Sequence, residues 1–514
     1  MSPLFEVRWR CLYTLFFSTC LFVLNGCSSV TLPDDAQKKL SYHFGYQQDS
    51  RLDHYFKPTE HGHDLTRESG FLPLNKGHDA LLTRLALIET AQKSLDLQYY
   101  IYRNDETSQL LTWRLYKAAE RGVRVRLLLD DMQARSDKAM AYLNAHPNIE
   151  IRLFNPHKNR HSRGLSFLGD FDRLNQRMHN KSLTADNVAS IVGGRNIGNE
   201  YFSYLSDVEF GDFDVLLHGN TVEQIADQFD LYWNSDYAIP MEWIYPDARP
   251  YTPAEVQQWL DKTKIADKFS LGIYDFTRLP LYHQLRQGHL PLHWGPAQLL
   301  YDVPSKLEGQ DSQLVLQLKS LLADVEHSLI LISPYFVPTE SGTQQLIRAV
   351  QSGKNIIIVT NSLASNDVFA VHGWYAKYRE QLVKGGVQLW ETKSTNKQNN
   401  RWSMTGSSRS SLHAKVMLMD NQKLFVGSMN WDPRSALLNT EMAVVLTQPE
   451  YVSQQSEQFI QSLPEVAYQV LWQDGDIVWR DAATETLYAS EPDASLWRRI
   501  GAWFSGILPI EDQL

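Results

Sequence analysis

The stretch LHAKVMLMD, residues 412–420, decides the fold because its chemical pattern occurs twice in the chain. Its apolar residues alternate with a period of two, which predicts a β-strand with His413 and Lys415 on one face. A single pair of this kind is most often a partly solvated surface pair. However, the same H-x-K-x4-D spacing recurs in RMHNKSLTADN, residues 177–187, with its histidine 234 positions earlier.

The residues that follow each copy also correspond. VGGRNIG follows the first copy and VGSMNWD the second, with a glycine 14 and an asparagine 17 positions after each histidine. A chance surface pair does not recur in such register, so we interpret the segments as one motif in two halves of a duplicated chain. The candidate residues are His179, Lys181, Asp186 and Asn196 in the first half and His413, Lys415, Asp420 and Asn430 in the second.

The segments around each motif alternate between strand-like and helix-like patterns. Short apolar runs are separated by stretches with helical spacing, which predicts βαβ units. The expected strands are residues 94–102, 123–131 and 148–154 in the first half and 328–336, 355–361 and 387–391 in the second. The predicted fold is therefore α/β, with two duplicated domains, each a mixed, mostly parallel sheet flanked by helices, and one active site at their interface.

The N-terminus has the pattern of a targeting segment. Two arginines precede an apolar run of 14 residues, which is short for a membrane-spanning helix of roughly 20. The run ends at LNGC, which resembles the lipobox of bacterial lipoproteins, and this implies cleavage before Cys27 and acylation of its thiol. The alternative is an uncleaved N-terminal anchor. Because Ser28 rather than an aspartate follows Cys27, the resemblance favours the outer membrane and a periplasm-facing protein.

Cysteine usage agrees with this interpretation. All three cysteines, at positions 11, 20 and 27, lie at or before the expected cleavage site, so the mature chain has no thiol for disulfides or a cysteine-bound zinc. The predicted organisation is a signal peptide (1–26), a linker (27–75), a first domain (76–260), an interdomain segment (261–295), a second domain (296–475) and an amphipathic C-terminal tail (476–514).

Two histidines and two lysines at one site suit in-line displacement through a covalent intermediate. One neutral imidazole attacks phosphorus, and the other, protonated, donates to the leaving oxygen. The lysines and the asparagines would bind the non-bridging oxygens of a phosphodiester. No metal and no cofactor is expected.

Each histidine needs an orienting group on its second ring nitrogen. The candidates are Asp214 and Glu441, which begin apolar strands downstream of the motifs. Asp186 and Asp420 are interpreted differently. Each stands an odd number of residues after its histidine and before an asparagine, so we expect it to shape a hairpin rather than to take part in the chemistry.

These motifs resemble the two HKD motifs of the phospholipase D superfamily, and the resemblance covers about residues 75–510. Segments such as DLQYYIY, GGRNIGNEYF, YFVPTESG and DPRSALLNTEM resemble bacterial cardiolipin synthases of the C type. The resemblance implies phosphatidyl transfer between phospholipids through a phosphohistidine, with His179 as the nucleophile and His413 as the acid and base. The residues alone do not rank the two histidines, and the lipobox is not typical of the cytoplasm-facing members.

Three alternatives remain at this point. A phospholipase D would use the same residues with water as acceptor. An HKD nuclease is disfavoured because the chain has a formal net charge of −10, and a non-catalytic lipid-binding lipoprotein because both motifs are intact. The expected partners are phospholipids and a membrane, reached through Cys27 and the C-terminal stretch SLWRRIGAWFSGI, whose aromatic and basic residues suit a lipid interface. The alternative for this stretch is a helix docked on the domain, and the need for an accessory protein stays open.

Overall fold

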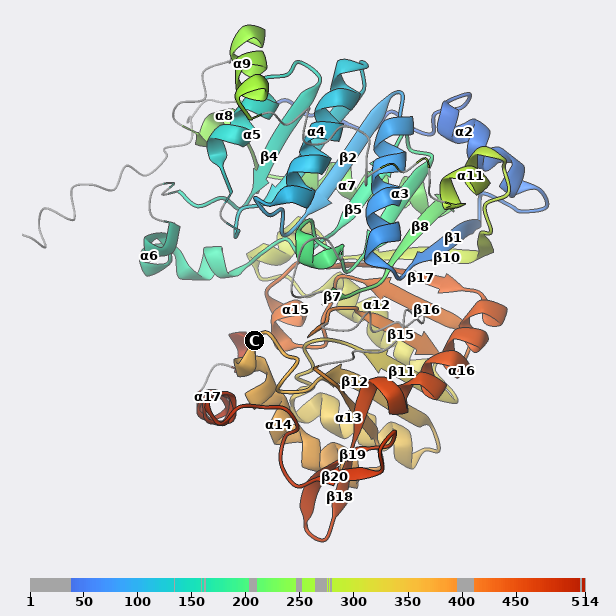
Figure 1. The fold of residues 1–514 in the computed structure, drawn as a ribbon, viewed down its shortest axis with the longest axis vertical. Coiled ribbons are helices and arrows are strands. Elements are labelled where there is room, and N and C mark those ends of the chain that lie inside the picture. The colour runs from blue at the N-terminus through green and yellow to red at the C-terminus, as the bar shows by residue number, and fades with distance from the viewer. Residues whose placement is uncertain are drawn as a thin grey trace, which may run out of the picture.

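The computed structural model describes residues 38–133, 135–158, 160, 163–202, 210–245, 252–263, 275, 277, 280–394, 411–508 and 511–513. The predicted signal peptide and Cys27 lie outside the described residues. Figure 1 shows two α/β halves, one above the other, with the first half in blue to green and the second in yellow to red.

The two halves repeat one strand order. In the first half it is β9 (Ala238–Pro240), β4 (Ile149–Phe154), β3 (Arg124–Asp130), β2 (Ser94–Tyr99), β5 (Ser182–Ala185), β6 (Ala189–Gly193), β8 (Asp214–Gly219) and β1 (Glu68–Leu74). In the second half it is β18 (Ala467–Gln473), β13 (Gln388–Thr392), β12 (Asn355–Asn361), β11 (Ser328–Ile332), β15 (Val416–Met419), β16 (Lys423–Gly427), β17 (Met442–Thr447) and β10 (His293–Tyr301). The predicted duplication is confirmed.

The sheets are mixed, as expected, but parallel pairing does not dominate. Only β2-β3-β4 and β11-β12-β13 pair in parallel within the described halves, and the remaining neighbours are antiparallel. The reason is that each motif strand forms a hairpin, β5–β6 or β15–β16, and hairpin neighbours are antiparallel. The predicted linker at 27–75 also contributes a sheet strand, since β1 pairs with both β8 and β10 and thereby joins the two halves.

Helices flank the sheets. In the N-terminal part they are α2 (Arg51–Phe56), η1 (Lys57–Glu60), α3 (Gly77–Thr90), α4 (Glu106–Glu120), α5 (Asp137–Asn144), α6 (Arg163–Asn175), η2 (Asn199–Tyr201), α7 (Asn220–Trp233), α8 (Met241–Ile244), α9 (Pro253–Thr263) and α11 (Pro280–Arg286). In the C-terminal part they are η4 (Pro304–Glu308), α12 (Gln313–Ala323), α13 (Thr339–Gln351), α14 (Phe369–Lys384), α15 (Pro433–Leu437), α16 (Pro449–Val466), α17 (Leu496–Ile507) and η5 (Glu511–Gln513). None of the helices within the described residues combines the length and apolarity that crossing a bilayer requires.

The sheets meet through a shared apolar core. Val192 and Val215 of the first half belong to the same buried cluster as Val416, Val426 and Val444 of the second. This cluster places β6 and β8 of the first half against β15, β16 and β17 of the second. The C-terminal segment is more than a tail, because β19 (Asp476–Asp481) and β20 (Thr486–Tyr488) extend the second sheet before α17 begins.

Candidate active site

The two motifs are bound to each other's halves through the backbone. The amide of His179 donates to the carbonyl of Thr440, and the amide of Thr440 donates to the carbonyl of Arg177, both at 2.9 Å. In the second motif, the amide of His413 donates to the carbonyl of Gly211 at 2.7 Å. His179 is thus held against the segment just before β17, and His413 against the segment just before β8.

Each histidine also contacts a carboxylate that belongs to the opposite half. Nδ1 of His179 lies 2.9 and 3.0 Å from the two carboxylate oxygens of Glu441, and Nδ1 of His413 lies 2.6 Å from Oδ2 of Asp212. Both carboxylates are buried. With Nδ1–H donating to a carboxylate, Nε2 of each ring remains as the reactive nitrogen.

The expected contact of Glu441 is therefore present, but the prediction for Asp214 is wrong. Asp214 pairs with Gly193 in the β6–β8 ladder, and its carboxylate lies 2.9 Å from Arg84 and 3.3 Å from Arg195. It is a buried structural ion pair. The orienting residue is Asp212, two positions earlier. A register signal was present in the sequence, since DFDVLLHG and EMAVVLTQ, aligned on their valines, place Asp212 opposite Glu441.

Both lysines are buried beside the histidines. Nζ of Lys181 donates to the carbonyl of His179 at 2.5 Å, and Nζ of Lys415 donates to the carbonyl of His413. Burial lowers the pKa of Lys181 to about 7 against the attraction of Glu441, and it lowers the pKa of Lys415 to about 8 against the attraction of Asp212 and Glu441. The two lysines bring positive charge next to the two histidines, and we expect them to bind the phosphate of the substrate.

The histidine rings are neutral near pH 7. Burial lowers the pKa of His179 to about 4, and the attraction of Glu441 only partly opposes this. Burial and the charge of Lys415 also lower the pKa of His413. Burial alone would raise the pKa of Glu441, but His179 and Lys181 outweigh it and lower that pKa to about 2. The pair is thus a neutral imidazole donating to a carboxylate, which suits His179 to nucleophilic attack.

We expect kcat/KM to be highest between about pH 4 and 7. Protonation of His179, whose pKa is about 4, removes the nucleophile below this range. Deprotonation of Lys181, whose pKa is about 7, removes a phosphate-binding charge above it, because a lysine is charged only below its pKa. The pH profile of the purified protein on a soluble phosphodiester measures both limbs.

Lys181→Arg provides the control for the alkaline limb. The guanidinium stays charged throughout this range, while its planar fork does not replace a point charge, so activity is expected to fall. The residual activity should no longer decline near pH 7. An unchanged alkaline limb in this variant would assign that limb to a group other than Lys181.

The two motif asparagines differ in their environments. Oδ1 of Asn196 accepts from the amide of Ile101 at 3.0 Å, and its Nδ2 donates to the hydroxyl of Tyr201 at 3.1 Å. Asn196 thereby positions Tyr201, which stands edge-on to His413 with ring centroids 5.3 Å apart. Because the amide carries a second N–H, the expected donation of Asn196 to substrate oxygens stays a prediction. Asn430 is buried, and its Oδ1 has no hydrogen-bond partner among the described residues. Its role toward substrate stays a prediction.

Other residues at the site were missed from the sequence. Tyr100 stands edge-on to His179 with centroids 4.9 Å apart, and Nζ of Lys181 lies 5.6 Å from the centre of its ring. The hydroxyl of Ser428 donates to Glu441 and thereby fixes the carboxylate that orients His179. Ser428 follows the motif glycine, so its place was visible in the sequence, whereas the approach of Tyr100 depends on the end of β2.

Asp186 and Asp420 occupy the hairpins, as expected. Each has a positive φ of 53° and is followed by an asparagine that also has a positive φ, the combination of a tight type I′ hairpin turn. Their carboxylates also reach the start of a central strand. Asp186 accepts from the amides of residues 92–94, and Asp420 accepts from those of residues 326–328, all between 2.7 and 3.0 Å.

We expect Asp186→Ala to lower the free energy of unfolding by about 2–4 kcal/mol, because three backbone donors lose a charged acceptor in a buried place. Asp420→Ala should cost less, since the amides of Glu326 and His327 are exposed and regain water. Thermal unfolding measures the difference. Activity per folded molecule should be preserved in both variants, and a specific loss in either would contradict the structural role.

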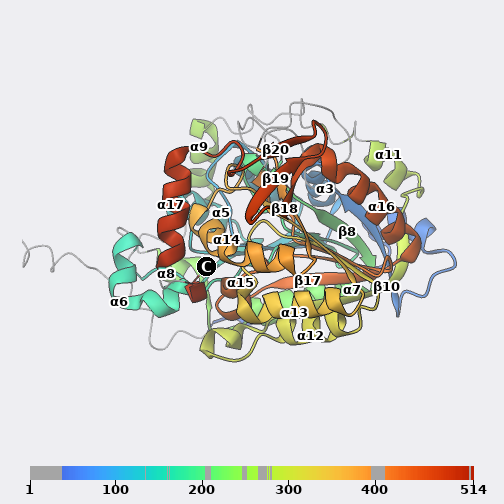
Figure 2. The ribbon, with the colours of Figure 1, turned by 90° about the horizontal axis from the view of Figure 1, so that it is seen from below.

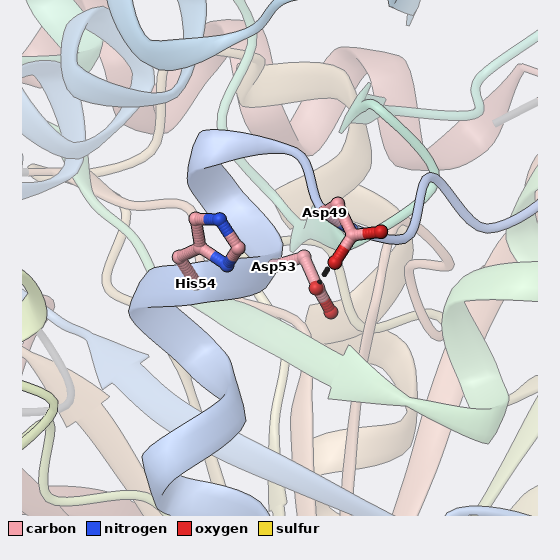
Figure 3. Close-up of side chains that lie close together, drawn as sticks. All are labelled: Asp49, Asp53 and His54. Carbon is pink, nitrogen blue, oxygen red and sulfur yellow. Dashed lines mark hydrogen bonds between the residues drawn. The ribbon is translucent and has the colours of Figure 1, made fainter.

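A group of metal-binding residue types lies elsewhere. Asp49, Asp53 and His54 are close together at the start of α2 (Figure 3). The carboxylate of Asp53 already accepts from the hydroxyl of Tyr46 at 2.7 Å and from the amide of Asp49 at 2.9 Å. The side chain therefore serves the local turn, and the group has no contact with the histidine site.

The duplicated halves and the crossed histidine–carboxylate pairs define a phosphodiester-cleaving protein of the HKD type. The family described as "Cardiolipin synthase, PLD-like domain" matches residues 85–233 and 318–463. A similar relative, "Cardiolipin synthase C" of Escherichia coli (strain K12), is 40% identical over 456 residues, which are 86% of this chain and 96% of that protein. The chain belongs to this cardiolipin synthase family of the phospholipase D superfamily.

Two more distant proteins are similar, one in sequence and one in fold. The "Major cardiolipin synthase ClsA" of Bacillus subtilis (strain 168) is 24% identical over 389 residues, which cover 74% of this chain and 65% of that protein. The crystal structure of phosphatidylserine synthase from Haemophilus influenzae superimposes with a TM-score of 0.54 at 12% identity, over 80% of this chain and 91% of the other. This likeness concerns the fold alone.

Proposed function

We propose that this protein is a phosphatidyltransferase that makes cardiolipin from phosphatidylglycerol and a second phospholipid through a phosphohistidine intermediate. The observation that carries the proposal is the crossed arrangement, in which His179 and His413 each point Nδ1 at a buried carboxylate of the other half. The family of the chain supports the lipid substrate.

The first step forms the covalent intermediate. Nε2 of His179 attacks the phosphorus of the donor lipid, and the bond from phosphorus to the head-group oxygen breaks. His413 gives its proton to the departing alcohol. The phosphate charge raises the pKa of His413 once the donor is bound, because an anion favours the protonated ring. Lys181 and Lys415 offset the charge on the non-bridging oxygens, and the bound anion keeps both lysines protonated.

The second step transfers the phosphatidyl group. A hydroxyl of phosphatidylglycerol gives its proton to His413 and attacks phosphorus, the P–N bond to His179 breaks, and cardiolipin leaves. Donor lipid and phosphatidylglycerol thus yield cardiolipin and the free head-group alcohol. If water attacked instead, the product would be phosphatidic acid.

The test incubates the detergent-purified protein with phosphatidylglycerol, alone or with phosphatidylethanolamine, and resolves the lipids by mass spectrometry. The expected product is diphosphatidylglycerol. Phosphatidic acid as the only product would establish a phospholipase D instead, and no product from either lipid would contradict the proposal.

We also propose that Cys27 is acylated and holds the mature chain on the periplasmic side of a bacterial membrane, with the outer membrane favoured. The support is the LNGC sequence and the serine at position 28. The intact mass of protein extracted from membranes tests this. The expected mass lacks residues 1–26 and includes the acyl groups, and an unmodified full-length mass would overturn the proposal.

A further inference from the structure

The helix α17 packs on the second half through its smallest residues. Ala502, Ser505 and Gly506 are buried, and Ala502 and Gly506 face Gly373 of α14. A Cβ atom at Gly373 would collide with the carbonyl oxygen of Ala502, so the two helix backbones are in direct contact. This closest contact between the helices does not involve the large apolar side chains of α17.

Those large side chains point outward. They follow one another at helical spacing and are between 46% and 80% exposed: Leu496, Trp497, Ile500, Trp503, Phe504 and Ile507. Phe369, at the start of α14, is 46% exposed, lies against Gly501 and extends the surface. We call these seven residues the α17 patch. Figure 2 shows α17 at an outer edge of the molecule, beside α14.

The two arginines of the helix do not belong to this surface. Nε of Arg498 donates to the carbonyl of Leu363 at 3.0 Å, and its Nη2 donates to the carbonyl of Asn366. Nη2 of Arg499 donates to the carbonyl of Glu491 at 2.7 Å. The basic residues that the sequence suggested for a lipid interface are thus turned into the protein, and Lys377 of α14 lines a cavity together with Trp503 and Ile507 of the patch.

The loop that Arg498 holds leads to the active site. It follows β12 and continues into Asp367, which accepts from the hydroxyl of Tyr335 at 2.8 Å. The charge of Asp367 also acts on Lys415, where it opposes the lowering of the lysine pKa. The α17 patch is therefore attached to a segment whose position affects the second motif.

We propose that the α17 patch is the surface with which this protein lies on a phospholipid bilayer, and that it binds by inserting apolar side chains rather than by attracting anionic head groups. The proposal deepens the proposed function and rests on it for the lipid substrate. A protein partner fits the patch less well, because protein interfaces have a polar rim, whereas exposed tryptophans around an apolar stripe suit the bilayer interface.

The test places a polarity-sensitive fluorophore on the full chain. Cys11, Cys20 and Cys27 are replaced by serine, and Trp503→Cys supplies the single labelling site. Leu231→Cys is the matched control, because Leu231 is 42% exposed on α7 of the first half. Each labelled protein meets vesicles of phosphatidylcholine alone and of phosphatidylcholine with phosphatidylglycerol, in low salt and in about 1 M NaCl, where the Debye length is ~3 Å.

The label at position 503 should brighten severalfold and shift to the blue with both vesicle types and in both salts, while the label at 231 stays unchanged. No response at 503 would overturn the proposal. A response confined to anionic vesicles and lost at high salt would replace insertion by electrostatic attraction. A response that grows with protein concentration without vesicles would identify the patch as a contact between two copies.

An activity comparison separates docking from chemistry. Trp497→Ser with Trp503→Ser should lower turnover of lipids in vesicles at least roughly tenfold, and leave turnover of short-chain lipids in detergent micelles unchanged. Leu231→Ser with Leu487→Ser removes exposed apolar surface elsewhere and should change neither. If the parent protein made no cardiolipin, the proposed function would fail, and the fluorescence result would still decide on docking.

Discussion

His179→Ala is expected to reduce phosphatidyl transfer by ~10⁴-fold or more, because the variant has no atom to accept the phosphatidyl group. His413→Ala is expected to reduce transfer between natural lipids by a similar factor, since neither the leaving oxygen nor the attacking hydroxyl can exchange its proton. Activity on natural lipids alone therefore does not separate the two roles.

A donor with a better leaving group separates them. With phosphatidyl-p-nitrophenol the departing phenolate needs no proton, so His413→Ala should still release one equivalent of p-nitrophenol and retain a phosphorylated protein. His179→Ala should release none. Mass spectrometry of the trapped protein locates the group. A phosphorylated His413 in the parent protein would exchange the two roles and contradict the assignment of His179 as the nucleophile, which the family resemblance implies.

Asp212→Asn is expected to lower kcat by ~10²–10⁴-fold with little change in stability. An amide does not stabilise the imidazolium that His413 becomes, and its NH₂ group favours the wrong tautomer of the ring. The substitution keeps the size of the side chain. Because Asp212 acts through His413, the pH profile of kcat is the decisive readout. In the lipid-bound protein both lysines stay charged, so the alkaline limb of kcat reports the protonated His413, and it should move to lower pH in this variant.

Asp214→Asn is the matched control, two residues along the same segment. It should break the buried contacts with Arg84 and Arg195 and lower the free energy of unfolding by ~3–5 kcal/mol. The fraction that remains folded should turn over normally with an unshifted pH profile. Equal kinetic losses in both variants would show that Asp212 has no specific link to His413.

The error at Asp214 shows what the patterns within one half do not predict, although an alignment of the two halves places Asp212 opposite Glu441. The motif histidines and lysines and the hairpin aspartates follow from residue order within one half. The structure brings the histidines and lysines of both halves to one site and leaves the aspartates in the hairpin turns. The carboxylate partners depend on a contact between halves, such as the bond from the amide of His413 to Gly211. The periodicity within one half does not indicate that contact. Asp212 and Asp214 are two residues apart, so both were candidates for the residue that orients the histidine.

The sheet and the C-terminal helix show the same distinction. Local patterns predicted the parallel strands β2-β3-β4 and the amphipathic character of α17. The turn residues Asp186 and Asn187 indicated an antiparallel hairpin in the sequence. The prediction of a mostly parallel sheet nevertheless underestimated how many antiparallel strand pairs such hairpins contribute. The inward direction of Arg498 depends on carbonyl groups more than 130 residues earlier in the chain, so composition alone pointed it toward lipid head groups.

Because each histidine is oriented by a carboxylate of the other half, phosphatidyl transfer requires both halves to be folded and packed together. While the first half is folded and the second is still being made, His179 has its ring but lacks Glu441, which arrives 262 residues later. A nascent or half-folded chain is then unable to attack the lipids around it. The enzyme becomes reactive only when both halves have folded and packed against each other. An incomplete chain therefore does not cleave membrane phospholipids.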